Sequence, residues 1–216
     1  IEEYAFERCK VSVIEIPDSV QNIGNNAFAA AGIEELTIGN GVQNIYLNVF
    51  YACVKLKTVK LGDGIKTIGA NMFSECGELT EIIFGNGLKE IKEYAFEYCI
   101  SLKNIVIPDG VTTIEYNAFA HCSELESVVL PNSITTLKSC IFAGCAKLKT
   151  VVIPDDFTCI KGNVFSYCSG LKEFVIPNSW TSIQEEMFIY CSGLTSITIP
   201  KTVTSIGWFA FGCCEN

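Results

Sequence analysis

Histidine, charge and long apolar runs are all scarce in this sequence of 216 residues. His121 is the sole histidine, which excludes a histidine-rich zinc site and leaves any Ser/His/Asp or Cys/His catalytic pairing dependent on one residue. Charged residues make up 18% of the chain and the net charge is −9, so nucleic acid would be repelled. No apolar run approaches the roughly 20 residues that span a bilayer, and no signal-peptide pattern opens the chain. We therefore expect no nucleic-acid partner and no membrane insertion in this segment.

What the sequence does contain is a repeat. Phenylalanine recurs at steps of 22, 22 and then seven times 23 residues, at Phe6, Phe28, Phe50, Phe73, Phe96, Phe119, Phe142, Phe165, Phe188 and Phe211. A fixed period of this length is typical of a solenoid, in which each unit buries its apolar side only against its neighbours. We therefore expect residues 1–216 to form a single solenoid domain of about nine repeats of 22–23 residues, with no linker.

A short strand is expected five or six residues after each of these phenylalanines. Three apolar residues recur there with the spacing of Leu102, Ile105 and Ile107, and the last two share one face of an extended chain. All six prolines fall in the column that ends this strand, because proline has no amide to give a sheet ladder. Asp or Asn follows in eight of nine repeats, as at Asp18 and Asn178, and can cap the turning backbone. The repeats predict one parallel sheet of about nine short strands.

The rest of each repeat predicts a second short extended piece and then a helical turn. The extended piece carries an apolar pair, such as Val111 and Ile114. Ala, Phe and Cys then recur with the spacing of Ala118, Phe119 and Cys122, which on a helix would span an arc of about 100° and point all three side chains inward. We expect helical turns on the sides of the coil away from the sheet.

Most of the twelve cysteines follow the same period. Nine stand three residues after a repeated phenylalanine: Cys9, Cys53, Cys76, Cys99, Cys122, Cys145, Cys168, Cys191 and Cys214. Such a column could support metal or redox chemistry, but the packing of small, buried, reduced thiols already explains it. Cys140, Cys159 and Cys213 lie off the column. The first two are in neighbouring repeats, so a disulfide between them stays open as an alternative to free thiols.

The motif AFxxCxxLxxVxIPDxVxxI covers the whole chain, for example as AFEYCISLKNIVIPDGVTTI and AFAHCSELESVVLPNSITTL. These residues resemble the BspA-like, or Treponema-type, leucine-rich repeats. The resemblance implies a curved right-handed coil, carried on bacterial or protist surface proteins and linked to adhesion, with no catalytic residues to transfer. Its location would be extracellular or at the cell surface, with signal and anchor outside this segment. Ala31, where the motif has cysteine, and the shorter first repeats depart from the pattern and affect local curvature.

Three local features suggest other chemistry, and each has a simpler explanation. Acidic residues recur at the corners, at Asp18, Asp63, Asp109 and Asp155. They alternate with Asn one repeat apart, so backbone capping explains them better than a calcium site. Glycines in GNG and GDG stretches resemble phosphate loops, at Gly39, Gly62 and Gly85, yet they stand in the proline column and form corners. His121 occupies a variable surface position. We predict no catalytic site, no metal and no cofactor.

The strands do predict an interaction surface. The residue between the two inward positions of each strand points away from the core, as Val106 does between Ile105 and Ile107. Five consecutive repeats are apolar there, at Ile83, Val106, Val129, Val152 and Val175. Polar residues flank them, at Glu81, Asn104, Ser127, Thr150 and Glu173, with the corner Asp and Asn on the other side. An apolar strip with a polar rim is typical of a binding site, although the strand propensity of Val and Ile gives the same pattern. We predict ligand-binding residues on this open, concave face: Ile83, Val106, Val129, Val152, Val175, Asn104, Ser127 and Thr150.

Two functions follow from this pattern. The favoured one is a non-catalytic binding module that recognises a protein or glycan on a host or neighbouring cell surface. The alternative is a structural spacer or self-assembling rod with no ligand of its own. Because Ile1 and Asn216 lie within repeats without polar caps, we expect a fragment of a longer protein and end-to-end self-association.

Overall fold

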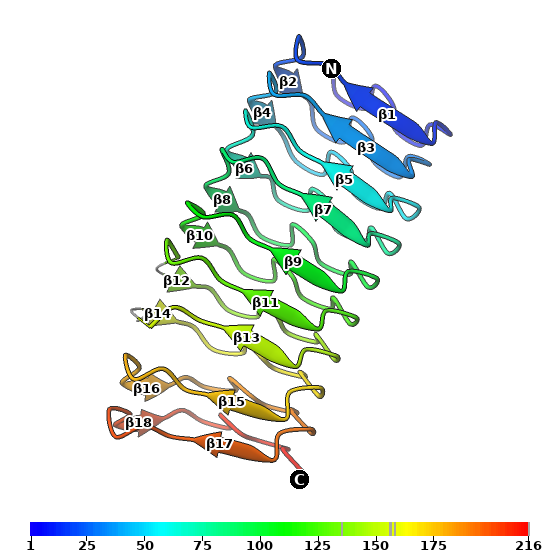
Figure 1. Cartoon of the computed structure of the whole chain (residues 1–216). Helices are drawn as coiled ribbons and strands as arrows, with labels where there is room; N and C mark the ends of the chain where they lie inside the picture. The colour runs from blue at the N-terminus through cyan, green and yellow to red at the C-terminus, as the bar shows by residue number, and fades with distance from the viewer. Residues whose placement is uncertain (135, 156, 158, 216) are drawn as a thin grey trace.

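The chain forms a stack of coils, one coil for each repeat, with the two termini at opposite ends of the stack (Figure 1). The computed structural model describes residues 1–134, 136–155, 157 and 159–215, except for the side chain of Cys159. Each complete coil contains a longer strand, a corner, a two-residue strand and a turn segment. We define the turn segment as the eight residues that end at the cysteine column, for example residues 92–99.

Two rows of strands run along the stack. The odd-numbered strands have three or four residues: β1 Val13–Ile16, β3 Glu35–Ile38, β5 Thr58–Lys60, β7 Glu81–Ile83, β9 Asn104–Val106, β11 Ser127–Val129, β13 Thr150–Val152, β15 Glu173–Val175 and β17 Ser196–Thr198. The even-numbered strands have two: β2 Asn22–Ile23, β4 Asn44–Ile45, β6 Thr67–Ile68, β8 Glu90–Ile91, β10 Thr113–Ile114, β12 Thr136–Leu137, β14 Cys159–Ile160, β16 Ser182–Ile183 and β18 Ser205–Ile206. All pairings are parallel and join equivalent positions of successive repeats. The predicted number, length and direction of the longer strands are confirmed.

The expectation of one continuous sheet is wrong, because the odd-numbered strands form three sheets: β1-β3-β5-β7, β9-β11-β13 and β15-β17. Each interruption coincides with an extra aromatic side chain where other repeats hold Ile, Leu or Val. Phe84, which follows β7, meets Phe96 edge-on with ring centroids 6.0 Å apart. Phe174, in β15, lies 5.1 Å from Phe165. A close-packed interior has little spare volume, so a larger ring at these two places is expected to disturb the pairing on one side, while β15 still pairs with β17 and β7 with β5.

The even-numbered strands are divided as well, into β2-β4, β6-β8-β10-β12-β14 and β16-β18. Buried Phe157 and Trp180 precede β14 and β16, where other repeats hold Val, Ile or Leu, so the same size argument applies to that break. The break between β4 and β6 has no such residue.

The expected helical turns are also wrong, since the described residues contain no helix. Alternate backbone amides in each turn segment bond within the coil and to the next coil. The amide of Glu97 donates to the Tyr94 carbonyl at 3.2 Å, whereas that of Phe96 donates to Ala118 in the following coil at 2.8 Å. Left-handed φ angles of 57° at Tyr94 and 58° at Tyr98 are incompatible with a right-handed helix. The segment is a run of β-turns that stack as a ladder.

The inward direction of the repeated Ala, Phe and Cys side chains is nevertheless confirmed, as at Ala118, Phe119 and Cys122. Each repeated phenylalanine stacks on the next, from Phe6 to Phe211, with ring centroids 4.9–6.0 Å apart and planes within 16°. At this separation the rings are offset, an arrangement that aromatic pairs favour. The column of rings forms the centre of the core.

The column cysteines are free thiols, and those from Cys53 to Cys191 are buried, as predicted. They also make bonds that the sequence did not suggest. The thiol of Cys122 donates to the Phe96 carbonyl oxygen at 3.2 Å, and the seven equivalent bonds measure 3.0–3.3 Å. Cys140 carries a free thiol as well. The side chain of Cys159, its suggested partner, lies outside the described part of the chain.

The first three corner residues, Asp18, Asn40 and Asp63, cap the backbone of the next coil, which confirms the predicted role at these positions. The Asn40 amide donates to Asp18 Oδ1 at 2.6 Å, and the Asp63 amide donates to Asn40 Oδ1 at 3.0 Å. Glycine is needed beside these caps, because a Cβ atom at Gly62 would collide with the Gly39 carbonyl oxygen.

Deleting residues 115–137, one complete coil, should leave a protein that unfolds cooperatively, because every column stays in register across the new junction. Deleting residues 115–126 should abolish folding, because it moves Leu and Phe out of their columns. Circular dichroism during thermal unfolding distinguishes the two variants. Equal cooperativity in both would contradict in-register stacking.

Replacing Cys122 by Ala should lower the free energy of unfolding by about 1–2 kcal/mol, through the lost thiol bond and the void left by sulfur. Cys213 is exposed, so Cys213→Ala is the matched control and should change stability by less than about 0.5 kcal/mol. Urea unfolding measures both. An equal effect of the two changes would show that the buried thiol of Cys122 does not contribute to the free energy of unfolding.

Stability should fall in alkaline solution. Burial raises the pKa of Cys53, Cys122 and Cys191 to about 12. The pKa of a cysteine in an unfolded chain is about 8.5. Above that pH the unfolded chain releases protons that the folded chain retains, so the free energy of unfolding decreases as pH rises, by about 1.4 kcal/mol per pH unit for each such thiol. Urea midpoints at neutral and alkaline pH measure the slope. Cys122→Ala should reduce the slope of unfolding free energy against pH by the contribution of one thiol. A free energy of unfolding that does not change with pH would contradict the burial of these thiols.

Candidate functional site: the exposed strip along the odd-numbered strands

The structure exposes all five apolar residues of the strip on the face of the odd-numbered strands. Their side chains point away from the core, while Ile105 and Ile107 beside Val106 are only 4% exposed. The three central members are Val106, Val129 and Val152, which are 78%, 54% and 50% exposed. Large aliphatic side chains gain nothing from solvent, so a contiguous row of them is a feature that needs an explanation.

The central part of the strip is held in strict register by one sheet. Val129 in β11 pairs with Val106 in β9 and with Val152 in β13. Parallel strands lie about 4.8 Å apart, so the three side chains form a continuous row. We call Val106, Val129 and Val152 the valine strip. The interruptions after β7 and β13 place Ile83 and Val175 in other sheets, one beyond each end of this row.

A row of small polar side chains runs parallel to the valine strip. Ser127 pairs in register with Asn104 and with Thr150, two residues before the valines on the same face. The Ser127 hydroxyl lies 3.1 Å from Asn104 Oδ1 and donates to it. These groups present hydroxyl and amide functions beside the apolar row. Such a combination suits a ligand that is partly apolar and partly hydrogen-bonding.

Two charged columns, two residues apart in the repeat, precede the polar row and form ion pairs between coils. Lys149 Nζ is 2.7 Å from Glu126 Oε2, and Lys147 Nζ is 2.8 Å from Glu124 Oε2. The bond from Lys149 lowers the pKa of the Glu126 carboxyl. Among the described residues, Lys172 in the next coil has no such ion pair.

Both interruptions of the odd-numbered sheets open a hollow on this side of the molecule, which the sequence reasoning missed. The larger hollow, of about 810 Å³, spans the break between β13 and β15 and is lined by Glu126, Ala146, Lys147, Lys149, Thr150, Gly170, Lys172 and Glu173. The smaller, of about 470 Å³, spans the break between β7 and β9 and is lined by Thr80, Ile100, Ser101, Lys103, Ser123 and Glu124. The signal available in the sequence was the pair of extra aromatic residues, Phe84 and Phe174.

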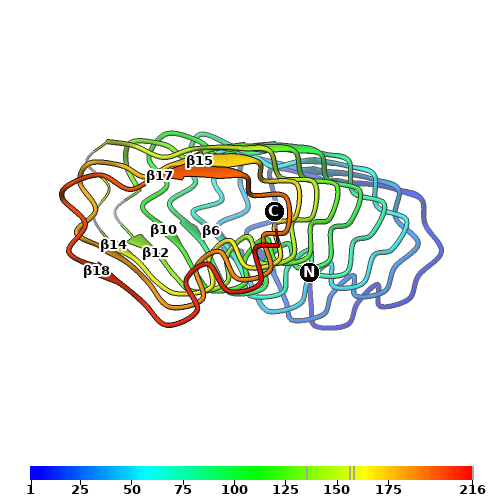
Figure 2. The same ribbon diagram turned by 90° about the horizontal axis from the view of Figure 1, so that it is seen from below.

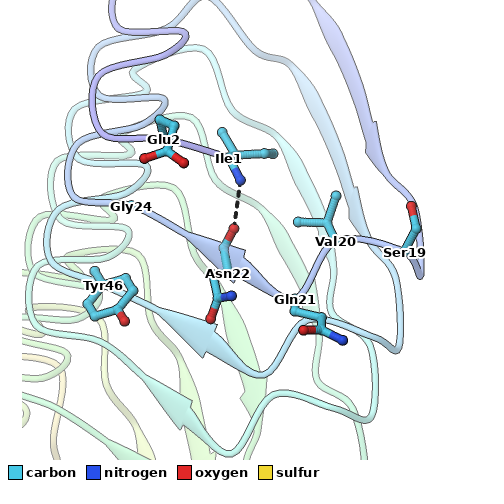
Figure 3. Close-up of a pocket in the computed structure, with 8 residues that line it drawn as sticks. All are labelled: Ile1, Glu2, Ser19, Val20, Gln21, Asn22, Gly24 and Tyr46. Carbon is cyan, nitrogen blue, oxygen red and sulfur yellow. Dashed lines mark hydrogen bonds between the residues drawn. The ribbon is translucent and has the colours of Figure 1, made fainter.

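A third hollow, of about 480 Å³, lies at the first coil, where the Ile1 ammonium donates to the Asn22 carbonyl at 2.8 Å (Figure 3). Glu2 is the one ionisable side chain besides tyrosine among its lining residues, which are Ile1, Glu2, Ser19, Val20, Gln21, Asn22, Gly24 and Tyr46. The residues that line this hollow include no set of catalytic groups.

The described residues contain no group of three or more His, Cys, Asp or Glu side chains placed to hold a metal. They also form no helix that is long and apolar enough to cross a bilayer. His121 stacks on Tyr98 at the surface, with ring centroids 4.6 Å apart.

The parallel strands, the corner column and the stacked coils define a leucine-rich repeat solenoid. The family model described as "BspA type Leucine rich repeat region" matches residues 1–126 and 89–216, which together cover the whole chain. The chain therefore belongs to the BspA-type leucine-rich repeat family, as the sequence motif indicated. The match indicates no enzymatic family.

Solved structures support the same fold. A leucine-rich repeat protein from Eubacterium ventriosum is 22% identical, with a TM-score of 0.72, over 100% of this chain and 68% of that one. A leucine-rich repeat protein from Bacteroides ovatus is 24% identical, with a TM-score of 0.65, over 99% of this chain and 74% of that one. The T. pallidum leucine-rich repeat protein is 26% identical, with a TM-score of 0.61, over 84% of this chain and 77% of that one. No curated protein matches the sequence.

Proposed function

We propose that this chain is a non-catalytic binding module of a cell-surface or secreted protein, which recognises a protein or glycan through the valine strip and its polar rim. The observation that carries the proposal is the in-register row of Val106, Val129 and Val152, exposed on one sheet face. Ile83 and Val175 extend the row beyond the sheet breaks, and Asn104, Ser127 and Thr150 supply hydrogen-bonding groups along its edge.

Strand propensity alone is a weaker explanation for this row. Threonine favours strands as valine does, and it fills the same column at Thr37 and Thr198, outside the strip. Threonine would satisfy the backbone in the central repeats too and would keep the surface polar. The strip therefore has a composition that ligand contact explains and strand formation does not require.

The alternative function is a structural spacer or self-assembling rod. It predicts that charged substitutions on the exposed face of the odd-numbered strands leave both folding and any partner capture unchanged, since no ligand would contact this face.

Changing Val129 and Val152 together to Asp should abolish capture of any partner found on a glycan array or an array of extracellular proteins, because two charges would be buried at the contact. The cooperative thermal transition should persist, since both side chains are exposed in the parent.

Changing Thr37 and Thr198 together to Asp is the matched control, because it adds the same charge to the same column outside the strip. This control should retain capture. Capture that survives in the Val129/Val152 variant would exclude the strip as the site and favour the spacer.

A further inference from the structure

The aromatic surface residues gather on a different side of the coil from the valine strip. All eight tyrosines fall within the turn segments, at Tyr4, Tyr46, Tyr51, Tyr94, Tyr98, Tyr116, Tyr167 and Tyr190. The sole histidine, His121, is there as well. Viewed along the stack, the turn segments lie across the coil from the odd-numbered strands (Figure 2). We call this side the turn face.

Several of these rings stack in the open rather than in the core. Tyr98 and His121 lie 4.6 Å apart with planes within 8°, and Tyr167 and Tyr190 lie 4.7 Å apart with planes within 14°. The three tyrosines are 44–55% exposed. Core packing therefore does not account for them.

The backbone does not account for these rings either. Tyr98, His121, Tyr167 and Tyr190 have φ angles of 58–60°, in the left-handed region that favours Gly and Asn. The column two residues before each repeated phenylalanine is also left-handed and uses asparagine five times, at Asn26, Asn48, Asn71, Asn117 and Asn163. The column with the stacked rings contains no asparagine. Aromatic residues at unfavourable, exposed positions indicate a role in contact with another molecule.

The charge of the turn face restricts what that molecule can be. The turn segments carry nine glutamates against four basic side chains, which are Arg8, Lys92, Lys138 and Lys161. Around Tyr98, Glu75 accepts a hydrogen bond from the Tyr51 hydroxyl at 2.7 Å. Burial and the charge of Glu75 raise the pKa of Glu97. Neither glutamate forms an ion pair within the described part of the chain.

Tyr98 stacks on another ring at one of its two faces. His121, one coil further on, covers the face toward the C-terminal end. Glu75 occupies the equivalent position one coil earlier, where its amide donates to the Glu97 carbonyl at 2.8 Å. The other face of Tyr98 is therefore directed toward the coil that carries Glu75, with the Glu97 side chain adjacent in sequence.

We propose that the turn face at Glu75, Glu97, Tyr98 and His121 binds an arginine side chain of a basic protein segment. A guanidinium is planar, stacks on a tyrosine ring and donates two parallel hydrogen bonds to a carboxylate. A lysine ammonium offers no plane to stack, and acidic glycans and nucleic acids would be repelled by the carboxylates. This surface is separate from the valine strip and does not depend on its function.

The test uses fluorescein-labelled hexa-arginine, with hexalysine as the comparison, and measures anisotropy at low and raised ionic strength. Hexa-arginine should bind about 5-fold tighter than hexalysine. Tyr98→Asn should remove this preference and weaken hexa-arginine binding about 5-fold, while the thermal midpoint stays within about 3 °C because asparagine suits the left-handed backbone. Tyr98→Phe should retain binding, since the ring and not the hydroxyl makes the contact.

Changing Glu75 and Glu97 together to Gln should weaken hexa-arginine binding about tenfold and reduce its salt dependence. The same change at Glu81 and Glu173, on the odd-numbered strands, is the charge-matched control and should leave binding unaltered. The Val129/Val152 aspartate variant should also bind hexa-arginine as the parent does. The proposal for the valine strip and the proposal for the turn face can therefore be rejected independently of each other.

Two outcomes would overturn the assignment. Equal affinity for the arginine and lysine peptides, unaffected by Tyr98→Asn, would reduce the effect to unspecific charge attraction. A neutral glycan that binds through Tyr98 and is indifferent to the loss of Glu75 and Glu97 would make the turn face a sugar-stacking surface instead.

Discussion

Register between successive coils is the constraint on which the rest of the structure depends. Each coil buries its apolar side chains only against the coils before and after it, so Phe must meet Phe and a cysteine thiol must meet the phenylalanine carbonyl of the preceding repeat. The backbone follows the same rule, since amides that a helix would use internally reach the neighbouring coil instead. A shift of one residue would break the ring column, the thiol bonds and both strand rows at once.

The regular parts of the fold could be predicted from the sequence because register repeats them visibly. The phenylalanine column, the strand triplet and the corner of proline or glycine recur at equivalent positions of successive coils. The turn segments were misjudged because the spacing of Ala118, Phe119 and Cys122 suits one helical turn and two successive β-turns equally well. The hydrogen bonds between successive coils, such as that from the Phe96 amide to the Ala118 carbonyl, favour the β-turns. The sequence of a single repeat does not reveal these bonds.

The candidate site was predictable in outline and not in detail. Alternation along the strand placed Val106, Val129 and Val152 on the outer face, where the structure has them. The division of the strip by sheet breaks depends on how the ring of Phe84 or Phe174 fits against its neighbours, which is a property of pairs of coils. The hollows beside those breaks follow from the same misfit, so they too required the three-dimensional arrangement.

A solenoid of this kind separates stability from recognition by position. Inward columns stay apolar, and the phenylalanine column is invariant, because each is packed on both sides by the equivalent residues of neighbouring coils. Outward columns contact solvent and are free to vary from coil to coil. The exceptions to free variation are therefore the informative residues. Valine persists in the outer strand column where threonine would serve the backbone, and tyrosine occupies left-handed positions where asparagine would fit better. In both places the chain holds a residue that its own fold does not require, on two different sides of the same coil, and these are the residues on which the two proposals rest.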